Sequence, residues 1–162
     1  MRVRIVFLGE DPRDPLQQAA ADYLARCGRR FDAGLQPLMP TRRGKNANDA
    51  SVRAAEAAAL LKASEGCTRI ALDKSGQQPS SSEAFAASVE SLLARGKPLA
   101  FLIGGATGLH ESLLQGAGSG GDVFALWSLS KVTFAHRLAV CVLAEQLYRA
   151  SEIARGGPYH KS

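Results

Sequence analysis

The chain has 162 residues, of which 46% are apolar and 22% charged, with a formal net charge of +5. This composition is that of one globular domain, and it excludes a chain that is mostly disordered. The longest strictly apolar run, residues 138–144, is far shorter than the roughly 20 residues of a membrane-spanning helix, and the N-terminus lacks the pattern of a signal peptide.

The modest positive charge is compatible with a nucleic-acid partner and equally with an ordinary basic surface. Cys27, Cys67 and Cys141 are widely spaced and form no Cys-x-x-Cys pair, and the three histidines are also scattered. This pattern indicates neither a disulfide framework nor a zinc site. We therefore expect a reduced, cytoplasmic protein without a metal.

Strand patterns and helix patterns alternate along the chain. In chain order, the predicted elements are a strand (2–8), a helix stopped by Gly28 (14–28), a weaker strand (34–39), a basic loop (40–48), a helix (49–64), a strand (68–72), a turn (73–76), a helix (80–95), a strand (99–103), a glycine turn (104–108), a brief helix (109–115), a glycine-rich loop (116–121), a strand (122–126), an irregular segment (127–134), a long helix (135–155) and a polar tail. This alternation predicts the α/β class with a mostly parallel sheet in a single domain, 1–162.

Three local patterns refine this prediction. Ser80-x-x-Glu83 has the spacing of a capping box, so it should open the helix that follows. Residues 99–103 are all apolar, which is typical of a central strand. The run 138–144 is apolar on every side of its helix, so that helix must be covered on more than one side, and a partner subunit is a natural cover.

Ligands of parallel α/β sheets bind beyond the carboxyl ends of the strands. Three such ends carry suitable segments, namely 72–76, 104–108 and 126–134. Gly104-Gly105-x-x-Gly108 would let a ligand approach the backbone, although as a motif it also fits a tight structural turn. The dinucleotide fingerprint is missing here, because the first strand ends in the acidic Gly9-Glu10-Asp11-Pro12.

Several segments together resemble the ribosomal RNA large-subunit methyltransferase H family, of the SPOUT or α/β-knot superfamily. They are Arg43-Gly44-Lys45-Asn46, Leu72-Asp73, Ile103-Gly104-Gly105-x-x-Gly108-Leu109, Ser128-Leu129-Ser130-Lys131-Val132-Thr133-Phe134-x-His136, Glu145-Gln146-Leu147-Tyr148-Arg149-Ala150 and Tyr159-His160-Lys161. The resemblance covers essentially the whole chain in order. Residues 116–121 look like an insertion relative to typical members.

The resemblance implies an S-adenosylmethionine-dependent enzyme that methylates N3 of a pseudouridine in helix 69 of 23S rRNA on the assembled ribosome. It also implies a homodimer and a C-terminal trefoil knot, with the knotted, cofactor-binding part at about 68–162. Nothing in composition or periodicity predicts a knot. The alternatives are a non-catalytic ribosome-binding factor and another nucleotide-dependent α/β enzyme.

The resemblance also assigns residues. The cofactor positions are Leu72, Gly104, Leu129, Ser130, Lys131, Val132, Thr133 and Phe134. In this interpretation loop backbone groups bind the adenine, Leu72 packs on its ring and Gly104 leaves room for the ribose. Without the resemblance, Leu72 would be a plain core leucine.

The predicted catalytic residues are Glu145, Arg149, Tyr159 and His160, and the predicted RNA-binding residues are Arg43, Lys45 and Lys161. Glu145 and Arg149 could equally be an intrahelical ion pair, and the tail could be a frayed end. His136 is interpreted as a residue of the loop or of the helix start.

Overall fold

The computed structural model of the chain describes residues 1–41, 48–118 and 120–161, with His160 and Lys161 described by their backbone alone. Five parallel strands form one sheet in the order β2-β1-β4-β3-β5. The strands are β1 (Val3–Leu8), β2 (Ala33–Leu38), β3 (Thr68–Gln77), β4 (Leu99–Ile103) and β5 (Ala125–Trp127). The helices are α1 (Pro15–Ala25), α2 (Gly28–Phe31), α3 (Asp49–Ala63), α4 (Ser82–Leu93), α5 (Glu111–Gln115) and α6 (His136–Arg155), followed by the 3-10 turn η1 (Pro158–Lys161). The predicted α/β class is confirmed.

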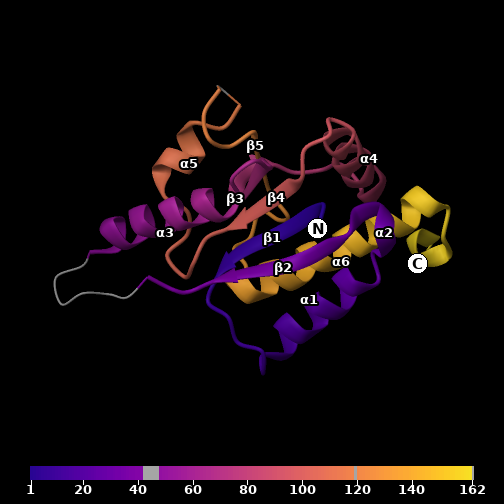
Figure 1. Ribbon diagram of the computed structural model, residues 1–162, viewed down its shortest axis with the longest axis horizontal. Helices are drawn as coiled ribbons and strands as arrows, with labels where there is room; N and C mark the ends of the chain where they lie inside the picture. Colours follow the sequence, from indigo (N-terminus) through magenta and orange to yellow (C-terminus); the bar gives the residue numbers. More distant parts are fainter. Residues whose placement is uncertain (42–47, 119, 162) are drawn as a thin grey trace.

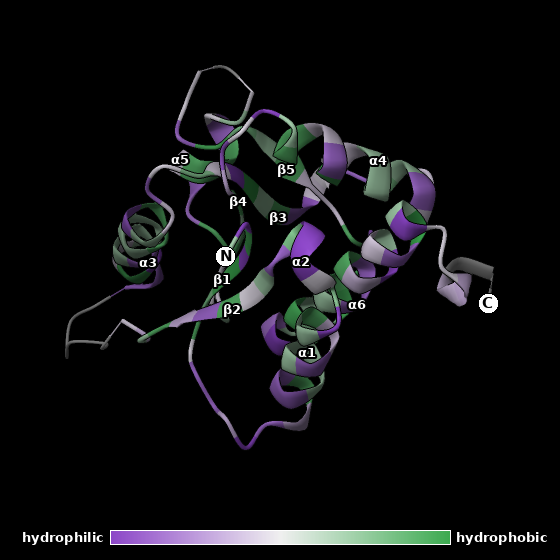
Figure 2. Cartoon of the chain, turned by 45° about the vertical axis from the view of Figure 1, so that its right-hand side comes forward, coloured by the Kyte–Doolittle hydropathy of each residue, from purple (hydrophilic) through white to green (hydrophobic). Residues whose placement is uncertain are grey.

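Helices cover both faces of the sheet (Figure 1). Side chains alternate along β1, so Ile5 and Phe7 pack with α1, α4 and α6, whereas Val6 and Leu8 pack with α3 and α5. Figure 2 shows the apolar faces of these helices turned toward the sheet. In the part of the chain that the structure describes, no helix is both long and apolar enough to cross a membrane.

The central position of residues 99–103 is confirmed. β4 lies between β1 and β3, and all five of its residues are buried. The long helix is also where it was predicted. It lies between α1 and α4, which supply much of the cover that its apolar run requires, and Leu138 is the exposed member of that run. The C-terminal trefoil knot stays a prediction.

Two helix boundaries differ from the prediction. The first helix ends at Ala25 rather than Gly28, because Gly28 has a φ of +69° and begins the separate turn α2. The predicted capping box is wrong by one residue. Ser81 is the N-cap of α4, and its hydroxyl accepts the amide of Ala84 at 3.1 Å, so Glu83 does not fall at the third helical position.

The predicted turn 73–76 is wrong, because β3 continues through it to Gln77. The pairing of β3 with β5 shifts register between Leu72 and Gln77, as at a β-bulge. Gly76 permits the close approach, since a Cβ there would lie 2.6 Å from the backbone carbon of Trp127. The last strand accordingly covers 125–127 rather than 122–126.

The brief helix and the glycine-rich loop also differ in detail. α5 begins at Glu111 rather than at 109, and the His110 side chain caps it by accepting the amide of Ser112. Gly118, Gly120 and Gly121 lie with Cys67 and Lys97, at the end where β3 and β4 begin. This is the opposite end of these strands from their carboxyl ends, so the loop lies away from the predicted cofactor segments.

Candidate functional site

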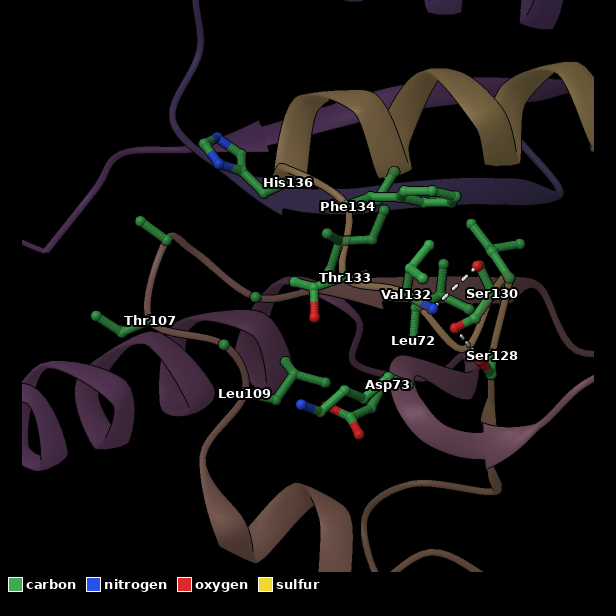
Figure 3. A pocket seen from close by; sticks show the side chains of 17 residues that line it. Leu72, Asp73, Thr107, Leu109, Ser128, Ser130, Val132, Thr133, Phe134 and His136 are labelled. Carbon is green, nitrogen blue, oxygen red and sulfur yellow. Dashed lines mark hydrogen bonds between the residues drawn. The ribbon is translucent and has the colours of Figure 1, made fainter.

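A cavity of about 440 Å³ lies beyond the carboxyl ends of β4 and β5, beside residues 72–74 of β3, where the pairing of β3 with β5 shifts register (Figure 3). Its volume falls in the range of small-molecule sites, and its position is where α/β sheets bind ligands. Four segments line it: 72–74 in β3, residues 103–109 other than Gly105 around the turn after β4, residues 128–134 other than Lys131 after β5, and His136 with Ala139 at the start of α6. The three segments that the sequence predicts to bind a ligand therefore meet at one place.

Hydrogen bonds within the segment 128–134 hold its shape. The buried hydroxyl of Ser128 donates to the carbonyl of Ser130 at 2.8 Å, and the Ser130 hydroxyl accepts the amide of Val132 at 3.1 Å. The amide of Ser128 also donates to the carbonyl of Gln77 at 2.9 Å, which ties the segment to β3. Backbone groups of this segment are thus held in place at the cavity wall, as recognition of a heterocyclic base by the backbone requires.

The glycine turn after β4 is held by its own backbone. A Cβ at Gly104 would lie 2.8 Å from the carbonyl carbon of Gly108 and 2.9 Å from the amide nitrogen of Leu109. The amide of Gly108 donates to the carbonyl of Gly105 at 3.0 Å. The predicted reason for Gly104, room for a ribose, is therefore incomplete. The space beside its Cα is filled by the turn itself, so a larger side chain would displace the turn.

Of the side chains that the structure describes, three ionisable ones line the cavity, namely Asp73, Lys74 and His136. One oxygen of Asp73 accepts the amide of Ser75 at 2.9 Å and its hydroxyl at 2.6 Å. Burial lowers the pKa of His136, and the nearby Arg137 cation lowers it further, while Asp14 acts in the opposite direction. The sequence analysis names Asp73 in a segment that resembles the family and interprets His136 as a helix-start residue, but it includes neither in the predicted site. Their closeness in sequence to the predicted cofactor residues could have indicated that they line the same cavity.

A second cluster lies further along α6. One oxygen of Glu145 accepts hydrogen bonds from both Nη2 of Arg149, at 2.7 Å, and the hydroxyl of Tyr159, at 3.2 Å. Nη1 of Arg149 donates to the carbonyl of Tyr159 at 3.2 Å. The intrahelical ion pair considered for Glu145 and Arg149 is present, and it also holds the tail.

Aromatic packing completes this cluster. The Tyr159 ring lies 4.7 Å from the Tyr148 ring, centroid to centroid, and the Arg149 guanidinium lies 4.7 Å from the Tyr159 centroid. Burial raises the pKa of Tyr159 to about 12, and hydrogen bonding to Tyr23 and the charge of Glu145 raise it in the same direction. A frayed end is therefore the wrong description of Tyr159, which belongs to a 3-10 turn docked on α6.

The cavity and this cluster are separate within one chain. Glu145, Arg149 and Tyr159 are not among the residues that line the cavity. Ala139, the last cavity residue of α6, precedes Glu145 by six positions and Arg149 by ten, which is about 9 and 15 Å along a helix. Arg43 and Lys45 lie outside the described residues, as do the side chains of His160 and Lys161.

Comparison with known proteins agrees with this geometry. A family model described as "Predicted SPOUT methyltransferase" matches residues 1–160. The chain belongs to the SPOUT methyltransferase family. Proteins named "Ribosomal RNA large subunit methyltransferase H" are similar over 99% of this chain. That of Thiobacillus denitrificans is 37% identical over 99% of its own length, that of Acidiphilium cryptum 39% over 94%, and that of Methylobacillus flagellatus 33% over 99%.

A SPOUT methyltransferase needs a methyl donor, and the cavity is where these residues could hold one. Leu72, Gly104, Leu129, Ser130, Val132, Thr133 and Phe134 line it, whereas Lys131 is exposed and does not. Contact of these residues with a cofactor stays a prediction. Among the described residues of this SPOUT methyltransferase, no group of three or more His, Cys, Asp or Glu side chains is arranged to bind a metal ion.

Proposed function

We propose that the chain transfers a methyl group from S-adenosylmethionine to large-subunit ribosomal RNA. One observation carries this proposal. A cavity lies at the strand ends where the sequence placed the cofactor segments, in a chain that matches proteins named ribosomal RNA large subunit methyltransferase H from end to end. Because the substrate is ribosomal, we assign the protein to the cytoplasm.

The cavity residues suit S-adenosylmethionine. Leu72 is half-buried and lines the cavity, so its side chain is available to pack on an adenine ring. The backbone of 129–134 offers amides and carbonyls for the adenine edge, and the turn after Gly104 forms the opposite wall. When bound, S-adenosylmethionine supplies an activated methyl group on a sulfonium.

The acceptor that we propose is N3 of a pseudouridine in helix 69 of 23S rRNA, on the assembled ribosome, as the family resemblance implies. N3 of the base is a weakly acidic imide nitrogen, so its proton must leave as the methyl group arrives. Positioning of the base against the methyl donor would supply most of the remaining rate enhancement. The tail offers groups for this task, with Tyr159 to stack on a base, His160 to contact it and Lys161 to meet a phosphate.

We further propose that the enzyme is a homodimer in which the tail of one subunit completes the cavity of the other. The support is the separation along α6, because one chain holds Glu145 about 9 Å and Arg149 about 15 Å along the helix from Ala139, and Tyr159 is bonded to both of them. Leu138, 36% exposed, and Val132, 67% exposed, lie beside the cavity and give a second subunit an apolar surface to cover.

Methyl transfer to intact ribosomes tests the proposed function. Purified enzyme, labelled S-adenosylmethionine and ribosomes that carry the unmethylated pseudouridine should yield one labelled base, which is then mapped. Ribosomes with uridine at that position are the matched control and should accept little label. Cofactor binding without transfer to any ribosome would contradict the proposal, and RNA binding without cofactor binding would favour a non-catalytic ribosome-binding factor.

Light scattering tests the dimer. Leu138→Asp should give monomers that remain folded, because the position is already partly exposed in one chain, and should lower methyl transfer more than cofactor affinity. The same substitution at the more exposed Met39, outside the sheet, is the control. A wild-type mass of one chain across a wide concentration range would contradict the dimer.

A further inference from the structure

His136 is the ionisable side chain of the cavity for which the predicted chemistry has no use. It is the first residue of α6, two positions after Phe134, and it lines the cavity. In Figure 3 its imidazole lies at the rim, on the side of Thr107 and away from Ser128 and Ser130. A group at the rim faces the space through which a base of RNA must enter.

The surroundings of the imidazole favour its neutral form. Among the described side chains, Arg137 on its own helix and Asp14 at the start of α1 act on the imidazole, Asp11 faces Arg137, and Asp73 and Lys74 line the same cavity. Nη1 of Arg137 lies 3.7 Å from Oδ2 of Asp14 and 3.9 Å from Oδ2 of Asp11. Burial and the Arg137 cation together hold the pKa of His136 below its ordinary value.

The other described ionisable groups of the cavity are less suited to take a proton. One oxygen of Asp73 is already occupied by two hydrogen bonds from Ser75, which tie the carboxylate to its own strand. The Lys74 side chain is exposed. A neutral imidazole has a free nitrogen and a basicity near neutral pH, which is where a general base works best.

We propose that His136 is a catalytic residue that accepts the imide proton of the target base during methyl transfer, an inference that rests on the proposed function. The lone pair of N3 forms the bond to the methyl carbon as the bond from that carbon to sulfur breaks and its electrons return to sulfur. The N3 proton passes to the free nitrogen of the His136 imidazole. The resulting imidazolium then releases the proton to water.

Single-turnover methyl transfer to ribosomes, measured from pH 5.5 to 8.5, tests this assignment. In the wild type the logarithm of the rate should rise with unit slope at low pH and become level above the pKa of His136, which burial and Arg137 lower from its ordinary value. His136→Gln should be about 10²-fold slower at pH 7 and should continue to rise with unit slope to pH 8.5, because hydroxide replaces the lost base. Its affinity for S-adenosylmethionine should stay within about threefold.

Two variants serve as controls. His110→Asn keeps a side chain that can cap α5 and should retain the wild-type rate and profile. His160→Ala should lower the rate yet keep the level region above pH 7. If His160→Ala, rather than His136→Gln, removes the level region, the tail takes the proton and the proposal is wrong.

The wild-type profile alone can overturn the inference, whatever the variants do. A rate that rises with unit slope through pH 8.5 in the wild type shows that no base with a pKa below neutrality takes part. An equal loss at every pH in His136→Gln also overturns it, because that result is structural. Absence of transfer by the wild type at any pH would instead refute the proposed function itself.

Discussion

The two halves of α6 border regions built from different parts of the chain. The first half faces the cavity. The cavity walls are loop backbone, held by hydrogen bonds of serine hydroxyls and by a tight glycine turn. The second half carries the Glu145, Arg149 and Tyr159 cluster, which is held by side-chain charge, hydrogen bonds and ring packing. A backbone wall tolerates most side-chain changes, except where a Cβ would displace it. A side-chain cluster, in contrast, is disturbed by substitution of any one of its residues.

Removal of residues 159–162 should have the largest effect. Methyl transfer to ribosomes should fall on the order of 10³-fold, because positioning groups for the RNA base would be lost. Affinity for S-adenosylmethionine, measured by calorimetry, should stay within a few-fold, since Tyr159, whose side chain is the one described in this stretch, does not line the cavity. A chain that lacks Ser162 alone is the control. Full activity of the truncated enzyme would show that the cluster only anchors the tail.

Gly104→Ala should have the second-largest effect, because it adds a Cβ where the backbone wall of the cavity leaves no room. Its Cβ would lie 2.8 Å from the carbonyl carbon of Gly108, so the turn must move and cofactor affinity should fall about 10²-fold, with a lower Tm. Gly34→Ala is the matched control. Its Cβ would meet the flexible end of the Met1 side chain rather than backbone, so affinity should stay near that of the wild type. Unchanged affinity in Gly104→Ala would mean that the turn yields easily.

Docking of the tail on α6 should depend on pH through the Tyr159 hydroxyl, with a smaller effect than the two changes above. Because the folded pKa of Tyr159 is raised from 10.0 to about 12, its protonated form favours the docked tail. This contribution is complete below pH 10 and is lost as pH rises toward 12. Ultraviolet titration should show a tyrosine step near pH 12, and Tyr159→Phe should remove that step. A wild-type titration without that step would contradict the docked geometry.

The two regions also differ in how far the sequence predicts them. Strand ends, and thus the cavity, follow from apolar runs such as 99–103 and the glycines after them, because parallel strands gather their carboxyl ends. The docking of Tyr159 on Tyr148 does not follow, since a contact across a helix stop depends on tertiary packing. The extension of β3 through 73–76 was missed for a related reason. Its turn-like residues are held by pairing with Trp127, a long-range contact.

Lys131 provides the smallest and most discriminating change. The resemblance places it among the cofactor residues, yet it is exposed and does not line the cavity, unlike its neighbours on both sides, Ser130 and Val132. If the wall is built from backbone, Lys131→Ala should change affinity for S-adenosylmethionine by less than about twofold, as expected of an exposed side chain. Phe134→Ala is the matched comparison in the same segment. It removes a ring that lines the cavity, so affinity should fall roughly tenfold or more. A tenfold loss in Lys131→Ala would instead mean that the lysine side chain turns toward the bound cofactor, and that this wall depends on charge as the far half of α6 does.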